Sequence, residues 1–284
     1  MERSIIRLLT CGSVDDGKST LIGRLLVETD SIPHDTIDST RNIRRSGSTI
    51  AAGEIDFSLL TDGLEAEREQ GITIDVAYRS MSLLDGRRLI ISDAPGHEQY
   101  TRNMAVAASR ADIAIVLVDA TKGVRTQTLR HLMICNLMGV SRVIVAINKL
   151  DAVAYSHDVF TSIQNDLLAQ MSRFDLPDIH FIPMSALAGD NVITHSAAMP
   201  WYTGQSLLDC IQSWHPQKSA EITMRARVQS IVRAEDFRGV STTIHRGSIS
   251  CGDRVSIFPS NQSATIATIV SDMKNVQSAA EGDA

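Results

Sequence analysis

Short apolar runs alternate with longer segments in which apolar residues recur every three or four positions, from about residue 5 to residue 214. The short runs predict buried strands, and the longer segments predict amphipathic helices. This alternation is typical of a mainly parallel sheet with helices on both faces, an α/β fold. The expected strands are Ile5–Thr10, Val76–Leu83, Leu89–Ser92, Ala114–Val118, Val143–Ile147 and His180–Ile182, and the expected helices are Ser19–Leu26, Gln99–Ser109, Thr126–Met138, Val159–Arg173 and Leu207–Ser213.

One connection in this region is too short for a helix. Asp85-Gly86 stands between two strand-like runs, which is a hairpin signal, so we expect one antiparallel edge strand. A stretch of about fifty residues that is rich in charge, from Glu28 to Asp75, precedes the hairpin. Loops of this length are uncommon unless they are functional, so this segment is a candidate switch or lid.

The pattern changes near Trp214, where short alternating runs separated by turns begin. Such runs predict antiparallel β-structure. We therefore expect a first domain over residues 1–216 and a second over residues 217–284. The second domain offers five or six short strands, fewer than a closed barrel needs, so we expect an incomplete antiparallel β-barrel.

Composition places the chain among ordinary globular proteins. Its 284 residues are 43% hydrophobic and 21% charged, which excludes intrinsic disorder and suffices for about two domains. A net charge of -6 argues against a protein that coats nucleic acid. Four scattered cysteines without a CxxC pair fit a reducing compartment, and no apolar run reaches the ~20 residues of a membrane span. We expect a cytoplasmic protein with no nucleic-acid or membrane partner.

The first chemical motif reads Gly-Ser-Val-Asp-Asp-Gly-Lys-Ser over residues 12–19 and matches G-x-x-x-x-G-K-[ST] between a strand and a helix. Its amides can surround phosphate oxygens, Lys18 can reach the β- and γ-phosphates, and Ser19 can ligate Mg²⁺. A glycine-rich turn that only caps a helix is the alternative. With five lysines against twenty-two arginines, a chance match is improbable. The expected phosphate-binding residues are Gly12, Ser13, Val14, Asp15, Asp16, Gly17, Lys18, Ser19 and Thr20.

Three further segments follow expected strands in order, at the sheet edge where ligands bind in open α/β folds. Asp93-Ala94-Pro95-Gly96 offers a carboxylate for the Mg²⁺ shell, through water, and a glycine amide for the γ-phosphate. Alone, this segment is also a common loop. In Asn148-Lys149-Leu150-Asp151, a carboxylate can accept two hydrogen bonds from guanine, Asn148 can meet the base edge, and the stem of Lys149 can cover its face. Ser185-Ala186-Leu187 offers amides to the guanine oxygen. Together the segments predict a GTP site.

Hydrolysis requires a Mg²⁺ ligand that senses the γ-phosphate and a group that orients water. Thr73 ends the long loop, where it also fits a β-branched residue that begins a strand. His97 directly follows the Asp-Ala-Pro-Gly segment. A lone histidine is more often structural, but this position favours a role in placing water.

Longer blocks resemble the translational GTPases of the elongation factor Tu type and, within them, the GTPase-subunit family of bacterial sulfate adenylyltransferases. The blocks are residues 12–20, 62–69, 67–78, 92–104, 190–192 and 199–204. The resemblance implies that Thr73 ligates Mg²⁺, that His97 positions water as a catalytic residue with Lys18, and that Val14 and Ile72 flank that water. It also implies GTP and Mg²⁺ as cofactors. A separate catalytic subunit of sulfate adenylyltransferase would be the partner, which transfers an adenylyl group from ATP to sulfate while this subunit hydrolyses GTP.

The chain departs from the family pattern in places. Val106-Ala107 replaces the usual Thr-Gly, Thr242 stands where a glycine is usual, and the family continues through further barrel domains. Three alternatives therefore remain beside the sulfate-activating GTPase. They are an elongation factor that delivers tRNA, a truncated GTP-binding fragment without coupling activity, and an ATP-dependent P-loop kinase, against which Asn148–Asp151 argues.

Overall fold

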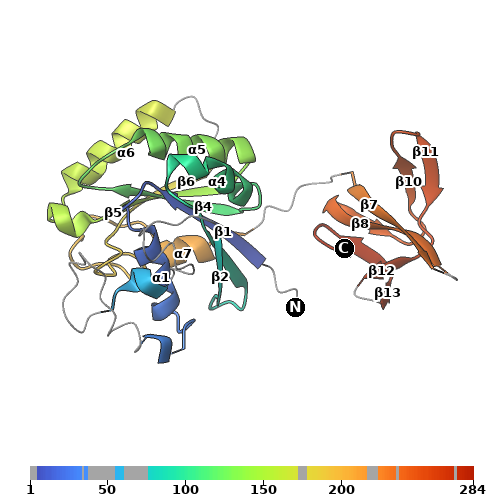
Figure 1. The fold of residues 1–284 in the computed structure, drawn as a ribbon, viewed down its shortest axis with the longest axis horizontal. Helices are drawn as coiled ribbons and strands as arrows, with labels where there is room; N and C mark the ends of the chain where they lie inside the picture. Colours follow the sequence, from blue (N-terminus) through green and yellow to red (C-terminus); the bar gives the residue numbers. More distant parts are fainter. Residues whose placement is uncertain are drawn as a thin grey trace. The chain divides into compact units, whose positions relative to one another are not determined.

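The computed structural model describes residues 5–33, 35–37, 55–60, 76–171, 178–215, 223–234, 237–271 and 274–284. The chain divides into two compact units, Met1–His215 and Pro216–Ala284 (Figure 1). No helix in these described ranges is both long and apolar enough to cross a membrane.

The first unit contains a six-stranded sheet in the order β2-β3-β1-β4-β5-β6. Five of the strands run parallel, and the edge strand β2 runs antiparallel to β3. The predicted α/β fold and its hairpin are confirmed, with a tight turn at Asp85-Gly86 in which Leu83 N–H donates to Arg87 O at 2.9 Å. The strands are β1 (Ile5–Gly12), β2 (Ala77–Ser82), β3 (Arg88–Asp93), β4 (Ile113–Asp119), β5 (Arg142–Asn148) and β6 (Ile179–Pro183).

The helices match the predicted segments closely, with one difference in the middle of the unit. The segment predicted as Gln99–Ser109 begins with a 3₁₀ turn, η2, before the α-helix starts at Thr101. The described helices are α1 (Lys18–Glu28), η1 (Phe57–Leu60), η2 (Glu98–Tyr100), α4 (Thr101–Ala108), α5 (Thr126–Met138), η3 (Leu150–Val153), α6 (His157–Met171) and α7 (Leu207–Gln212).

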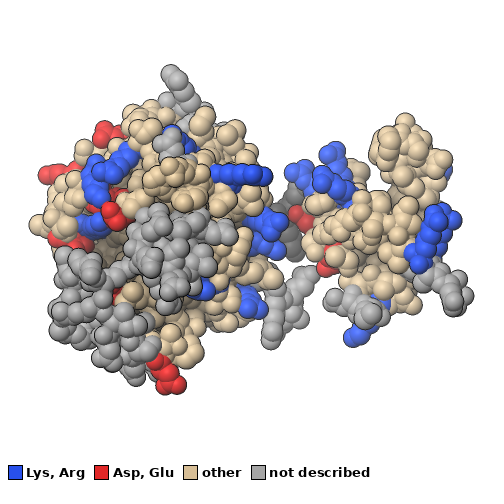
Figure 2. Space-filling model, in the orientation of Figure 1, with Lys and Arg blue, Asp and Glu red and all other residues tan. Residues whose placement is uncertain are grey.

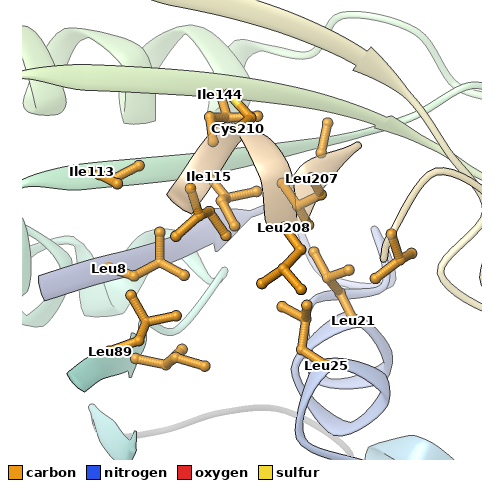
Figure 3. Packing of buried hydrophobic residues seen from close by; sticks show 14 of the residues in the cluster. Leu8, Leu21, Leu25, Leu89, Ile113, Ile115, Ile144, Leu207, Leu208 and Cys210 are labelled. Atoms are coloured by element: carbon orange, nitrogen blue, oxygen red, sulfur yellow. The ribbon is translucent and has the colours of Figure 1, made fainter. Parts of the chain in front are cut away.

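Strand β4 shows why the central strands are continuously apolar and do not alternate between apolar and polar residues. Ile113, Ile115 and Leu117 pack with α1 and α7 on one face of the sheet (Figure 3). The intervening residues, such as Val116, pack with α4, α5 and α6 on the other face. Every residue of β4 is buried, so both faces require apolar side chains.

Two arginines, Arg87, which is buried, and Arg142, which is partly buried, bind the end of the short helix α7. Arg87 donates to the carbonyls of Gln212 and Trp214, the latter at 2.5 Å. Arg142 donates to Cys210 O at 2.7 Å. A helix leaves its last carbonyls unpaired, and these guanidinium groups supply the missing donors.

The second unit contains eight described strands that pair as four two-stranded antiparallel sheets. The predicted antiparallel structure is present, but the expected five or six strands were too few, because three-residue strands are too short to show an alternating pattern. No sheet closes into a barrel among the described strands. The strands are β7 (Arg225–Ala234), β8 (Phe237–Arg246), β9 (Ser248–Ser250), β10 (Arg254–Ile257), β11 (Gln262–Thr265), β12 (Ile269–Ser271), β13 (Lys274–Val276) and β14 (Ser278–Ala280).

Few apolar side chains are buried in the described part of this unit. Ile244 and Ala279 are buried, whereas Phe258 is 77% exposed. Six further large apolar residues lie on the surface, namely Val228, Ile231, Val232, Val240, Ile257 and Val270. The hydrophobic contribution to folding is therefore concentrated in the first unit.

The contacts of Arg87 give a stability prediction. Arg87→Ala should lower the free energy of unfolding of the first unit by about 2–4 kcal/mol, because hydrogen bonds from a charged donor contribute ~1.5–3 kcal/mol each and do not add fully. Urea unfolding followed by tryptophan fluorescence measures this change. Arg88→Ala is the matched control, because the side chain of Arg88 is exposed and donates to Ser80 Oγ on the neighbouring strand, at 2.9 Å. Equal midpoints for both variants would contradict the role of Arg87.

Candidate nucleotide-binding site

The predicted phosphate loop lies between β1 and α1, as the motif requires. Gly17 precedes the helix with φ of 95°, a left-handed conformation that favours glycine. No side chain caps this helix, and its first turn holds no acidic residue. Its first amides and the positive end of its dipole are therefore available to an anion.

Lys18 lies in the wall of this loop. Its Nζ donates to Gly12 O at 3.0 Å and to Ser13 O at 2.8 Å. Burial lowers the pKa of Lys18, while the nearby carboxylates Asp93 and Asp16 oppose the shift. Charge neutralisation by several groups is needed to keep an ammonium in so buried a place.

Gly96 brings the β3 loop directly against the phosphate loop. A Cβ at this position would lie 2.5 Å from Gly12 O and 2.6 Å from Lys18 Nζ. No larger residue fits there without displacing the lysine. The structure thus places the Asp93–Gly96 segment beside the phosphate loop.

Asp16 contributes a carboxylate that the motif pattern does not specify. Its Oδ2 accepts from Ser13 N–H at 2.7 Å, which closes the loop on itself. Its Oδ1 is buried with no partner among the described residues, and burial raises the pKa of Asp16. The motif treats this position as free, so sequence reasoning could not assign the role.

The residues expected near Mg²⁺ are described in part. Ser19 lies in the first turn of α1, and buried Asp93 ends β3 and accepts from Thr10 Oγ1 at 3.1 Å. Hydroxyl and carboxylate oxygens are suitable ligands for Mg²⁺. Within the described ranges, no group of three or more His, Cys, Asp or Glu residues could hold a metal ion. Thr73 and Ile72 lie outside the described residues.

Asn148 connects three segments of the site. Its Nδ2 donates to Asp16 O at 2.8 Å, and its Oδ1 accepts from Ala186 N–H at 2.8 Å. The side chain is buried. We expected the Asn148 amide to meet the edge of the base. In the structure, its nitrogen binds the phosphate loop and its oxygen binds the 185–187 loop, so both loops are held to the end of β5.

Lys149 is held by a residue that the sequence analysis missed. Asp119 ends β4 in register with Asn148, and its Oδ2 accepts from Lys149 Nζ at 2.8 Å. Thr121 Oγ1 donates to the same carboxylate at 2.6 Å. Burial alone would raise the pKa of Asp119, but hydrogen bonds from Lys149 and Thr121 lower it to about 2. An acidic residue at the end of a predicted strand was the available signal.

The remaining residues expected in the site differ in the exposure of their side chains. Asp151 is exposed in the first turn of η3, whereas the Leu150 side chain is fully buried in the core and leaves only its backbone for the site. Leu187 is half exposed, at the tip of the 185–187 loop. His97 is exposed, and its Nδ1 accepts from Gln99 N–H at 3.4 Å.

Comparison with known proteins identifies a family for most of the chain. The model of the elongation factor Tu GTP binding domain matches residues 3–252. Sulfate adenylyltransferase subunit 1 of Citrobacter koseri is 48% identical over 287 residues, which cover 99% of this chain and 60% of that protein. The protein of the same name from Francisella tularensis subsp. novicida is 47% identical over 95% of this chain and 57% of its own length. The chain thus spans about 60% of these relatives.

Solved structures share the fold. The GTPase-like domain of S. cerevisiae Ski7, bound to GDP and inorganic phosphate, aligns with a TM-score of 0.62 at 17% identity over 99% of this chain and 69% of that one. The elongation factor SelB from Methanococcus maripaludis, in complex with a GTP analogue, aligns with a TM-score of 0.53 at 22% identity over 100% and 51%. At such identities the likeness shows the fold alone.

The bonds of Asp119 predict a pH-dependent stability. Since folding lowers its pKa from about 3.8 to about 2, its contribution is complete above pH ~4 and is lost as the pH falls toward ~2. Asp119→Asn should therefore destabilise the protein at pH 7 by about 1–3 kcal/mol. The difference from the parent should shrink below pH ~4. Urea unfolding across this range measures it, and a difference that grows on acidification would contradict the assignment.

Proposed function

The chain belongs to the elongation factor Tu GTP-binding domain family, and on that premise we propose that its site binds GTP with Mg²⁺ and hydrolyses the γ-phosphate. The observation that carries the proposal is the pair of hydrogen bonds through which Asn148 joins the phosphate loop to the 185–187 loop. A phosphate-binding element and a base-binding element would thereby be held together at one edge of the sheet.

Each element has a distinct task in this proposal. The amides of the phosphate loop and Lys18 bind the β- and γ-phosphates, and Asp151 accepts two hydrogen bonds from guanine. Ser19 and, through water, Asp93 hold Mg²⁺, which would neutralise phosphate charge when bound. His97 orients the attacking water, and Thr73 supplies a further Mg²⁺ ligand, as the family resemblance implies.

The names of the relatives extend the proposal to a process. Proteins named sulfate adenylyltransferase subunit 1 match 95–99% of this chain, and the name implies a further subunit. We infer that GTP hydrolysis here is coupled to adenylyl transfer from ATP to sulfate on a catalytic partner subunit. The mixed sulfate–phosphate anhydride is an uphill product, so its synthesis must draw on a second reaction. Four free cysteines fit work in the reducing cytoplasm.

A tRNA-delivering elongation factor is the second candidate, since the matching family model is that of the elongation factor Tu GTP binding domain. The charge distribution favours the GTPase coupled to sulfate activation over the tRNA-binding factor. The net charge is -6, and on the visible face of the first unit acidic and basic side chains are interspersed (Figure 2). A phosphate backbone would require a continuous basic surface.

Base selection by Asp151 gives a test of the nucleotide. The parent should bind GTP more tightly than ATP by orders of magnitude, and Asp151→Asn should shift the preference toward xanthosine triphosphate, because one acceptor becomes a donor. Loss of a bidentate contact to a charged group costs several kcal/mol, or ~10²-fold or more in affinity. A competition titration measures this, with Asp158→Asn, on the exposed start of α6, as the control. Equal affinity of the parent for ATP and GTP would refute the GTP site.

Coupling has its own test. The chain is mixed with a sulfate adenylyltransferase catalytic subunit, ATP and sulfate, with GTP or with a non-hydrolysable GTP analogue. GTP should raise the yield of adenylyl sulfate several-fold, and the analogue should not. The same yield with and without GTP, from a chain that hydrolyses GTP, would contradict coupling while leaving the GTP site intact.

A further inference from the structure

Arg24, on the inner face of α1, makes contacts that link the helix to the 185–187 loop. Its Nε donates to Ala186 O at 2.5 Å, and its second terminal nitrogen donates to Leu187 O. The remaining terminal nitrogen pairs with Glu28 Oε1 at 2.6 Å. The Arg24 side chain is only 13% exposed, and its bond to Ala186 O is partly shielded from water.

The same loop has one amide to spare. Ala186 N–H donates to Asn148 Oδ1 at 2.8 Å, Ala188 N–H to Ser185 Oγ at 3.1 Å, and Gly189 N–H to Ser185 O at 2.8 Å. Among the residues that the structure describes, no acceptor lies against Leu187 N–H. It is therefore the amide of this turn that can still donate to a ligand.

The peptide unit between residues 186 and 187 joins these two observations. Ala186 C=O and Leu187 N–H belong to one planar trans peptide, so they point in opposite directions. A guanidinium that holds the carbonyl on the α1 side fixes the amide on the other side. Arg24 thus controls the direction of the spare donor.

We propose that Arg24 is a positioning residue for base selection, which fixes Leu187 N–H toward the exocyclic oxygen at position 6 of the purine. The inference rests on the proposed GTP site and adds to it a residue outside the nucleotide-binding motifs. Arg24 acts through the loop and does not touch the base.

An arginine suits this role because its planar fork can serve two successive carbonyls at once. The fork is also held from its other side, since the guanidinium carbon lies 4.3 Å from the centre of the Phe57 ring. The backbone of η1 rests on α1 next to it, where a Cβ on Gly23 would lie 2.0 Å from Phe57 O. Lysine would keep the charge but would donate from a single nitrogen on a flexible stem, without the rigid planar fork.

The test compares two nucleotides that differ only at position 6. GTP carries oxygen there, whereas 6-thioguanosine triphosphate carries sulfur, a weak acceptor, and keeps the groups that face Asp151. Dissociation constants are measured for the full chain and for Arg24→Lys. We expect Arg24→Lys to weaken GTP binding by about tenfold and 6-thioguanosine triphosphate binding by less than about twofold. The preference for GTP over the thio analogue should therefore fall about fivefold or more.

This ratio separates positioning from stability, because a partly unfolded variant would lose affinity for both nucleotides by the same factor. Glu28→Gln is the matched control, since it removes the ion pair but leaves both bonds to the loop carbonyls, and it should keep the parent ratio. An equal loss for both nucleotides, or no loss for either, would overturn the inference. A parent that binds neither nucleotide would instead refute the proposed GTP site, and this inference with it.

Discussion

The amide of Asn148 is the interaction on which the site depends. Its two hydrogen bonds, both buried, join loops that lie more than a hundred residues apart in the sequence. A buried amide that lost one partner would leave an unpaired polar group at a cost of about 1–3 kcal/mol, so the three segments hold their positions together. Phosphate binding and base binding are therefore not independent properties of this fold.

Buried charge is the second constraint. Lys18, Asp16 and Asp119 all lie at the carboxyl edge of the sheet with little access to water. Each is compensated by carbonyls, amides or an opposite charge, as in the pair of Asp119 with Lys149. Such pairs contribute little net stability, because the cost of desolvation offsets their attraction, but they fix the orientation of the side chains involved. The edge is stiff where a nucleotide would need fixed donors and acceptors.

The sequence predicted the sheet and its helices well, because continuous apolar runs such as β4 and periodic segments such as α5 each bury a defined face. It also placed the phosphate loop, whose glycines and lysine occupy fixed positions. It did not identify Asp119 or Arg24, because their partners come from distant segments and only the fold brings these together. The second unit was predicted least accurately, since strands of three residues leave no period to detect.

The arginine bonds at the end of α7 have a mechanical consequence. Arg87 holds the carbonyl of Trp214, just before the boundary between the two units. Tension applied to the chain beyond residue 216 would load this bond before it reached the hydrogen bonds within the six-residue helix. The Arg87 guanidinium is itself held by Asp85, at 2.6 Å. A pulling force on the chain beyond Trp214 would therefore act on this pair first, and α7 and the core beneath it would be protected from unwinding.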